Sequence, residues 1–334
     1  MNSIIQDKFF DWRNAFHDPV TTGITLGIVA ILVITPLVFL AFSMLGRIKE
    51  PQRTELFKRY YTWLALAPLM IGPVLLGPGW TILAVLGLSL LCYREYARVT
   101  GLFRHKLIGA LVVTGILFVF FAAFDHWYGF FVALFPLTVS AIAAFAILAD
   151  QPKGYIQRVA LGILGFVLFG SALGHLAYFA NDLNYRAIIL MLLLCVELND
   201  VFAYISGKSF GRRKLCPNTS PNKTIGGALG ALVLTTILAS VLGHYIFLGS
   251  ALDTPLHLII LGIIISVVGA LGDLMLSSIK RDIGIKDTGV VLPGHGGLLD
   301  RFDSILLVAP ATFHYIGYYV GIGLDQPTRI ITGG

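Results

Sequence analysis

Long apolar segments alternate with short polar loops along almost the whole chain. A helix needs about 20 mostly apolar residues to cross the hydrocarbon core of a bilayer. Ten segments approach this length, and they are 22–45, 60–77, 79–97, 106–124, 127–149, 158–180, 185–206, 224–248, 256–279 and 303–323. The pattern predicts an all-α, polytopic integral membrane protein with about ten transmembrane helices.

The basic residues concentrate in every second loop between these segments. Of the 24 Lys and Arg residues, 20 fall in the loops after the first, third, fifth, seventh and ninth segments. Basic loops mark the cytoplasmic side of a membrane protein. We therefore expect these five loops to be cytoplasmic and both chain termini to lie outside, as in a multi-pass protein of the bacterial inner membrane.

Composition agrees with this picture. The chain is 57% hydrophobic and 13% charged, whereas soluble domains carry about 25% charged residues. The net charge of +6 is explained by the basic loops, so no nucleic-acid partner is predicted. The first apolar segment is long enough to span and is followed by a basic loop, which favours a membrane helix over a cleaved signal peptide.

Charge gathers between the last two apolar segments. Asp273 lies near the end of the ninth segment, and Ser277 and Lys280 follow at i+4 and i+7, so the three share one helix face. An acid at this depth usually faces a cavity, an ion or a partner. The alternative is a structural Asp–Lys pair near the interface.

The loop that follows, LPGHGGLLDRFD, combines glycines with carboxylates. Gly296 and Gly297 follow His295, and such a turn can offer free N–H groups to an anion. Asp300 and Asp303 stand at i and i+3 at the start of the tenth segment. Carboxylates beside Lys and Arg are what Mg²⁺-bound phosphates require; a solvated loop of mixed charge is the alternative.

A second polar group lies in the seventh segment and the loop after it, CVELNDVFAYISGKSFGRRKLCPNTSPNKTIGG. Asp200 and Tyr204 share one face of an apolar helix, where an acid is a candidate functional residue or makes a helix–helix hydrogen bond. Ser220 to Thr224, SPNKT, place Lys223 and a hydroxyl at the start of the next helix, where a phosphate is favoured.

Two runs resemble the phosphatidate cytidylyltransferase (CDP-diacylglycerol synthase) family. The run SSIKRDIGIKDTGVVLPGHGGLLDRFD, residues 277–303, fills the constrained positions of the family signature. The run DVFAYISGKSFGRRKLCPNTSPNKT, residues 200–224, is similar to a second family feature. Before residue 200 the resemblance rests on hydropathy, with REYAR (Arg94 to Arg98) as a fainter match.

The resemblance implies a polytopic enzyme, usually a homodimer, that joins CTP to phosphatidic acid and releases CDP-diacylglycerol and pyrophosphate. It implies Mg²⁺, with a second cation left open, and Asp273 and Asp300 as the metal-binding carboxylates. The remaining residues expected in catalysis are Ser277, Lys280, Arg281, Lys286, Asp287, His295, Arg301 and Asp303. Those expected to bind substrate are Asp200, Tyr204, Lys208, Ser220, Lys223, Thr224, Gly296 and Gly297.

The chain departs from the family pattern in two places. Ile225 and Gly226 follow the SPNKT run, where the family usually has Glu or Gln at the second position. Residues 1–59 form an extra helix and basic loop, before an expected catalytic domain at 60–334. Both departures leave open the same chemistry on a different lipid phosphate.

Two other functions are weighed against this one. The motif of enzymes that transfer from a CDP-lipid to an alcohol is absent from the sequence. An ion-coupled transporter could use Glu197, Asp200 and Asp273, but the polar residues cluster on one side and no inverted repeat is visible.

Overall fold

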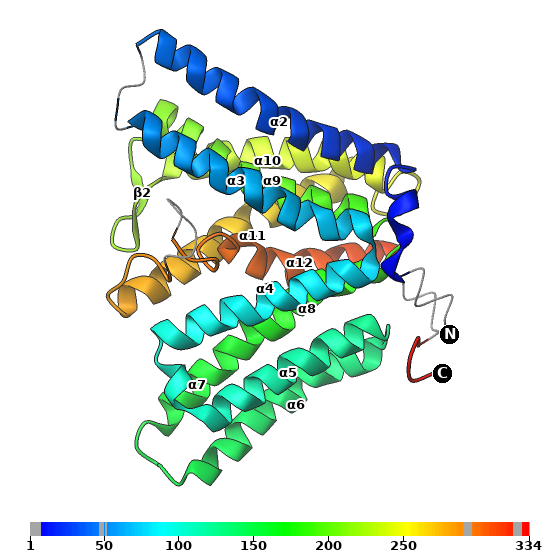
Figure 1. The fold of residues 1–334 in the computed structure, drawn as a ribbon, viewed down its shortest axis with the longest axis vertical. Helices are drawn as coiled ribbons and strands as arrows, with labels where there is room; N and C mark the ends of the chain where they lie inside the picture. Colours follow the sequence, from blue (N-terminus) through cyan, green and yellow to red (C-terminus); the bar gives the residue numbers. More distant parts are fainter. Residues whose placement is uncertain (1–7, 47–49, 51, 290–295, 323–328, 334) are drawn as a thin grey trace.

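The computed structural model describes residues 8–46, 50, 52–289, 296–322 and 329–333. Within these ranges the chain is a bundle of long helices with one short hairpin (Figure 1). The α-helices are α2 (Pro19–Met44), α3 (Gln52–Leu76), α4 (Pro78–Val99), α5 (Lys106–Phe124), α6 (Tyr128–Phe145), α7 (Tyr155–Gly165), α8 (Leu173–Tyr178), α9 (Tyr185–Phe210), α10 (Ile225–Ile246), α11 (Pro255–Asp282) and α12 (Asp303–Val320). The shorter elements are the 3-10 turns η1 (Asp11–Asn14), η2 (Leu102–Arg104), η3 (Ala146–Ala149) and η5 (Phe179–Asn181), the π-helical turn η4 (Phe166–Ala172), and the strands β1 (Lys214–Cys216) and β2 (Ser220–Thr224).

The prediction of a polytopic, all-α membrane protein is confirmed. Each of the ten predicted segments contains helix, and the sixth is one run through α7, η4, α8 and η5. Among the described residues, seven helical segments are long and apolar enough to cross a membrane. α3, α4 and α12 are not among the seven, so the count of ten stays a prediction.

The two described chain ends lie at the same end of the bundle (Figure 1). Lys8 donates hydrogen bonds to Asn181 at 2.9 Å and to the carbonyl of Phe124 at 3.0 Å. Thr332 donates from its hydroxyl to Asp125 at 2.6 Å. The hairpin and the loop between α11 and α12 lie at the opposite end, as the alternation of basic loops predicts. The side of the membrane that each end faces stays a prediction.

Helix α9 lies at the centre and is tied to its neighbours by a buried amide. The side-chain oxygen of Asn199 accepts hydrogen bonds from Thr235 of α10 at 2.8 Å and from Ser266 of α11 at 2.7 Å. A polar group in an apolar bundle needs such partners. These hydrogen bonds hold α9, α10 and α11 together. Most of the predicted site lies on these helices or in the segments that follow them, the hairpin after α9 and the loop between α11 and α12.

The hairpin adds to the sequence-based expectation. Lys223 and Thr224 stand directly before α10, as expected for a helix start, and Ser220 to Thr224 also form β2, paired antiparallel with β1. Pro221 is tolerated because a two-stranded hairpin leaves each strand an unpaired edge. Thr224 also caps α10, since its hydroxyl accepts a hydrogen bond from the N–H of Gly227 at 3.1 Å.

Helices α11 and α12 approach closely at Gly272. A Cβ atom there would lie 2.7 Å from the carbonyl oxygen of Asp303 and 3.1 Å from the Cα of Ser304. A glycine is therefore required for the start of α12 to lie against α11.

We predict that Gly272→Ala destabilises the protein by about 1–3 kcal/mol, because the added methyl group meets backbone atoms that cannot move independently. The measurement is thermal unfolding in detergent. Gly87→Ala in α4 is the matched control, since a Cβ there meets nothing within 4 Å. Equal unfolding temperatures for the two variants would contradict the close approach.

Candidate active site

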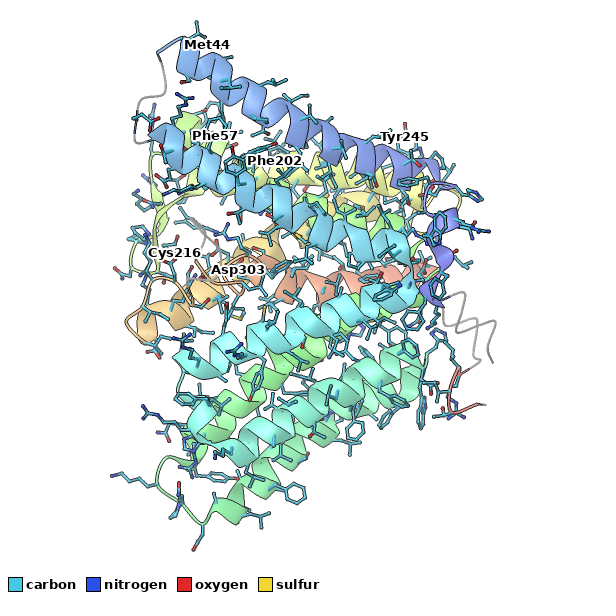
Figure 2. All side chains as sticks on the ribbon, viewed as in Figure 1. Met44, Phe57, Phe202, Cys216, Tyr245 and Asp303 are labelled. Atoms are coloured by element: carbon cyan, nitrogen blue, oxygen red, sulfur yellow. The ribbon has the colours of Figure 1, made fainter. Side chains whose placement is uncertain are left out.

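A small polar cavity lies where the loop-side ends of α9, α11 and α12 meet. Its volume is about 130 Å³. The lining residues are Val196, Glu197, Asp200, Asp273, Lys280, Asp287, Asp300, Arg301, Asp303 and Ser304. Six of these ten carry a carboxyl group and two carry a cationic side chain, so the cavity has an excess of potential negative charge. Figure 2 shows Asp303 toward the same end of the bundle as Cys216 of β1.

A second, larger cavity adjoins the first. It has a volume of about 1000 Å³ and is lined mainly by α2, α3 and α9. Glu197, Asp200, Asp287 and Arg301 line both cavities. The polar cavity therefore continues into a space with mostly apolar walls.

Asp300 holds together the loop between α11 and α12. One carboxylate oxygen accepts from Lys280 at 2.8 Å. The other accepts from the N–H groups of Thr288 at 2.8 Å and Gly297 at 2.9 Å. Burial opposes the charge, but these hydrogen bonds outweigh it and lower the pKa of Asp300 below its ordinary value. Asp300 is 7% exposed, so its charge is retained by these partners rather than by water.

Glu95 of α4 supports the same loop from the other side. Its carboxylate accepts from the N–H groups of Leu298 at 3.0 Å and Leu299 at 2.9 Å, and from the Thr288 hydroxyl at 3.2 Å. The local sequence does not single out Glu95 as a site residue. The faint REYAR match contained it, but nothing local indicates a contact 203 residues away.

The N–H groups of residues 297–299 in the glycine turn are thus already bound to the protein's own carboxylates. The expectation of N–H groups free for an anion is wrong for residues 297–299, because Asp300 and Glu95 already accept from them. Gly296 has φ of +85°, which favours glycine, and its Cβ position lies 2.8 Å from an Asp300 oxygen. The described glycines therefore shape the loop. His295 lies outside the described residues.

Asp273 joins α11 to the hairpin. Its carboxylate accepts from Ser277 at 3.2 Å and forms an ion pair with Lys223 of β2. Its cationic partner is thus Lys223, while Lys280 pairs with Asp300. Burial opposes the charge on Lys223, but the Asp273 carboxylate outweighs it and raises the pKa of Lys223.

Asp303 and Arg301 contribute one carboxylate and one cation at the start of α12. One Asp303 oxygen accepts from the N–H of Ser304 at 2.7 Å, and the side chain is 7% exposed. The Nε of Arg301 is buried and has no hydrogen-bond partner among the described residues. A buried donor without a partner is costly. An anion in the adjoining cavities would satisfy it.

The other predicted residues differ in whether they line a cavity. Lys286 and Tyr204 line the larger cavity, and Asp287 lines both cavities. Lys208 lies 4.8 Å from the centre of the Tyr204 ring. Arg281 instead donates at 3.3 Å to the carbonyls of Thr219 and Ile285 and lines neither cavity.

Ser220 belongs to the hairpin and also lines neither cavity. The departure at Gly226 has a local explanation. A Cβ there would lie 2.8 Å from the carbonyl oxygen of Phe210 and 3.2 Å from the Cα of Gly211. The larger side chain that the family usually has would not fit between these backbone atoms.

The donor set of the small cavity suits a hard divalent cation. Among the described residues no group of three or more His, Cys, Asp or Glu side chains is arranged as a preformed metal cage. Mg²⁺ is usually held by one or two carboxylates together with substrate phosphates, so it does not need such a cage. Asp273 and Asp303 each line the cavity from a different helix.

Comparison with known proteins gives the family. Residues 57–319 match the cytidylyltransferase family. The uncharacterized protein YnbB of Escherichia coli (strain K12) is 33% identical over 282 residues, which is 82% of this chain and 92% of YnbB. The chain belongs to the cytidylyltransferase family and is a multi-pass membrane nucleotidyltransferase.

Relatives with an assigned activity match over shorter stretches. The phosphatidate cytidylyltransferase of Bacillus subtilis (strain 168) is 43% identical over 128 residues, covering 37% of this chain and 46% of that enzyme. The enzyme of the same name from Rickettsia typhi is 34% identical over 154 residues, covering 45% of this chain and 68% of that enzyme. The resemblance noted in the sequence is thus confirmed at the level of the family.

We predict that Glu95→Ala lowers kcat for nucleotidyl transfer at least about tenfold. The N–H groups of Leu298 and Leu299 lose their acceptor, at a cost of about 1–3 kcal/mol for each buried group, and the loop that carries Asp300 and Arg301 is then held less firmly. Hydrogen exchange should report faster exchange at these two amides. Glu50→Ala, which removes an exposed carboxylate near the start of α3, is the control. Unchanged exchange at both amides in Glu95→Ala would contradict the support described for Glu95.

Proposed function

We propose that the protein is a phosphatidate cytidylyltransferase, which joins CTP to phosphatidic acid and releases CDP-diacylglycerol and pyrophosphate. The observation that carries the proposal is the pair of joined cavities. A carboxylate-rich cavity suited to a metal ion and a nucleotide phosphate opens into a largely apolar cavity suited to a lipid. The family match and the names of the relatives support the same chemistry.

The reaction needs no strong general base. At neutral pH the phosphate monoester of phosphatidic acid is largely dianionic. One of its oxygens forms a new bond to the α-phosphorus of CTP, the bond from that phosphorus to the β-phosphate oxygen breaks, and pyrophosphate leaves. The main obstacle is repulsion between two polyanions, which positioning and cationic groups offset.

The protein's own residues take distinct parts in this scheme. Arg301 lines both cavities and would donate to a phosphate at their junction. Lys286 would neutralise phosphate charge from the larger cavity. Lys280 is held by Asp300 and Lys223 by Asp273, so the two lysines also fix the carboxylates of the small cavity.

A Mg²⁺ ion would be held by carboxylates of the small cavity. The resemblance assigns Asp273 and Asp300. Both oxygens of Asp300 already accept hydrogen bonds, and those of Asp273 are engaged by Ser277 and Lys223. Only one oxygen of Asp303 is engaged among the described residues, which favours Asp303 as the metal-facing carboxylate and Asp300 as the residue that holds the loop. Asp273 would join Asp303 at the metal if Lys223 turned toward a phosphate. When bound, the ion would supply charge stabilisation to the transferring phosphate. A second cation would have further carboxylates available in Glu197 and Asp200.

The proposal also covers the orientation of the protein in the membrane. The loop end of the bundle would face the cytoplasm of a bacterial inner membrane, where CTP is available, and both termini would lie outside. The homodimer implied by the resemblance stays a prediction. The same chemistry on another lipid phosphate is the second candidate, because Gly226 stands where the family usually has Glu or Gln.

We predict that CTP labelled at its α-phosphate transfers label to the chloroform phase when purified protein, Mg²⁺ and phosphatidic acid are mixed. CTP labelled at its γ-phosphate is the control, because that label leaves with pyrophosphate. Chelation of divalent cations should abolish the transfer and added Mg²⁺ should restore it. Label that remains in water with phosphatidic acid would contradict the substrate, and label that remains in water with every lipid phosphate would contradict the reaction.

We predict that Asp303→Asn lowers kcat about 100-fold or more, as expected for a charge that acts in the transition state. The variant keeps the shape of the side chain and an oxygen that can accept from Ser304. Thermal unfolding is therefore expected to change little. Full activity in this variant would contradict a role for Asp303 at the metal.

Asp300→Asn should also abolish transfer while the protein remains in the membrane. Its pKa is lowered, so the carboxylate is ionised across the working range and the effect should be the same between about pH 6 and 8. If Asp300→Asn lost activity only at acidic pH, the conclusion that Asp300 is ionised from about pH 6 to 8 would be contradicted. Retention of full activity would contradict any role for Asp300 in the site.

A further inference from the structure

Helix α2 lies outside the part of the chain that matches the family, and it packs against the bundle only lightly. The family match begins at residue 57, after α2 ends at Met44. Only Thr21 and Ile24 of its 26 residues are buried. Figure 1 shows α2 at the edge of the bundle beside α3.

One face of α2 nevertheless lines the larger cavity. The residues that do so are Ile28, Ile31, Leu32, Thr35 and Phe39. Steps of three, one, three and four residues place all five on a single helix face. The part of α2 nearer the loop end of the bundle is therefore a wall of the cavity that adjoins the candidate active site.

The larger cavity is apolar along its helices and carries charges of both signs toward the loop, with Glu55, Glu197, Asp200 and Asp287 as its acidic residues. Met70 and Ile71 of α3 and Leu190, Leu193 and Leu194 of α9 are among the residues of its apolar lining. Its volume of about 1000 Å³ is at the upper limit of the range of about 300–1,000 Å³ for small-molecule pockets. Such a space can hold hydrocarbon chains.

Three cationic residues line the same cavity, namely Arg59, Lys286 and Arg301. Arg59 pairs with Glu55 at 2.5 Å, and the two side chains are 52% and 61% exposed. An exposed pair of this kind contributes little stability, so a phosphate can compete for the guanidinium. The combination of apolar walls and cations is complementary to a lipid phosphate.

We propose that α2 forms a wall of the acyl-chain site of the lipid phosphate, and that Arg59 is a further ligand of its phosphate group. Acyl chains lie against the Ile28–Phe39 face, and the phosphate faces the junction with the polar cavity. This inference rests on the proposed function. It goes beyond it because it assigns lipid selection to a helix outside the family match.

The first test uses two neighbouring residues of α2. Leu32 lines the cavity, whereas Val33 does not and is 57% exposed. Leu32→Trp should raise KM for a long-chain phosphatidic acid at least about tenfold without changing KM for CTP or KM for a dihexanoyl lipid phosphate. Val33→Trp should leave all three values unchanged. Leu32→Ala, which removes bulk without a clash, should shift preference toward longer chains.

The second test compares two arginines at the start of α3. Arg59→Gln should raise KM for the lipid phosphate at least about fivefold and leave KM for CTP unchanged. Arg53→Gln is the matched control, because Arg53 lines neither cavity. If both variants raised KM for the lipid phosphate equally, the effect would come from the overall positive charge of this surface, and the role of Arg59 would be overturned.

A binding readout separates this inference from the proposed function. Phosphatidic acid with a photoactivatable acyl chain should label wild-type peptides of α2 containing residues 28–39, and Leu32→Trp should reduce that labelling. Wild-type protein that makes no CDP-lipid would overturn the proposed function. Active wild-type protein in which Leu32→Trp matches Val33→Trp in kinetics and labelling would overturn the role of α2.

Discussion

The attachment of the loop between α11 and α12 to the carboxylates of Asp300 and Glu95 is the constraint on which the site depends. Asp300 accepts from Lys280 and from two backbone N–H groups of the loop, and Glu95 accepts from the next two N–H groups. Each partner satisfies a polar group that would otherwise be buried at a cost. Because α4 and α11 supply these contacts, the loop is held between two helices of the bundle.

With the loop held in this way, charges of both signs are brought together at one end of the helices. Lys280 and Lys223 each pair with a carboxylate of the small cavity, while the buried Nε of Arg301 has no hydrogen-bond partner in the part of the chain that the structure describes. The remaining excess of carboxylates suits a cation, and Arg301 suits a phosphate. A metal-bound nucleotide carries both, and the proposed function would account for the gathering of charge in an otherwise apolar chain.

Much of this organisation is predictable from local sequence. Apolar runs of spanning length predict the helices. The two motif runs single out Asp300, Asp303 and Lys223, and Asp273 stands out as an acid near the end of an apolar segment. The sequence does not indicate Glu95, because its contacts join residues about 200 positions apart. The sequence also suggests that the N–H groups at the glycines are free to bind an anion. This is wrong for residues 297–299, because a pattern of residues does not show which N–H groups are bound by the protein's own carboxylates. The large cavity depends on how α2, α3 and α9 diverge, which periodicity does not specify.

The most direct measurement of the central claim is a structure of the full chain with Mn²⁺ in place of Mg²⁺ and a non-hydrolysable CTP analogue. The account predicts an anomalous signal in the small cavity, within coordination distance of Asp273 or Asp303, with the analogue's phosphates beside Arg301. A metal and nucleotide bound at the opposite end of the bundle, near the chain termini, would contradict it.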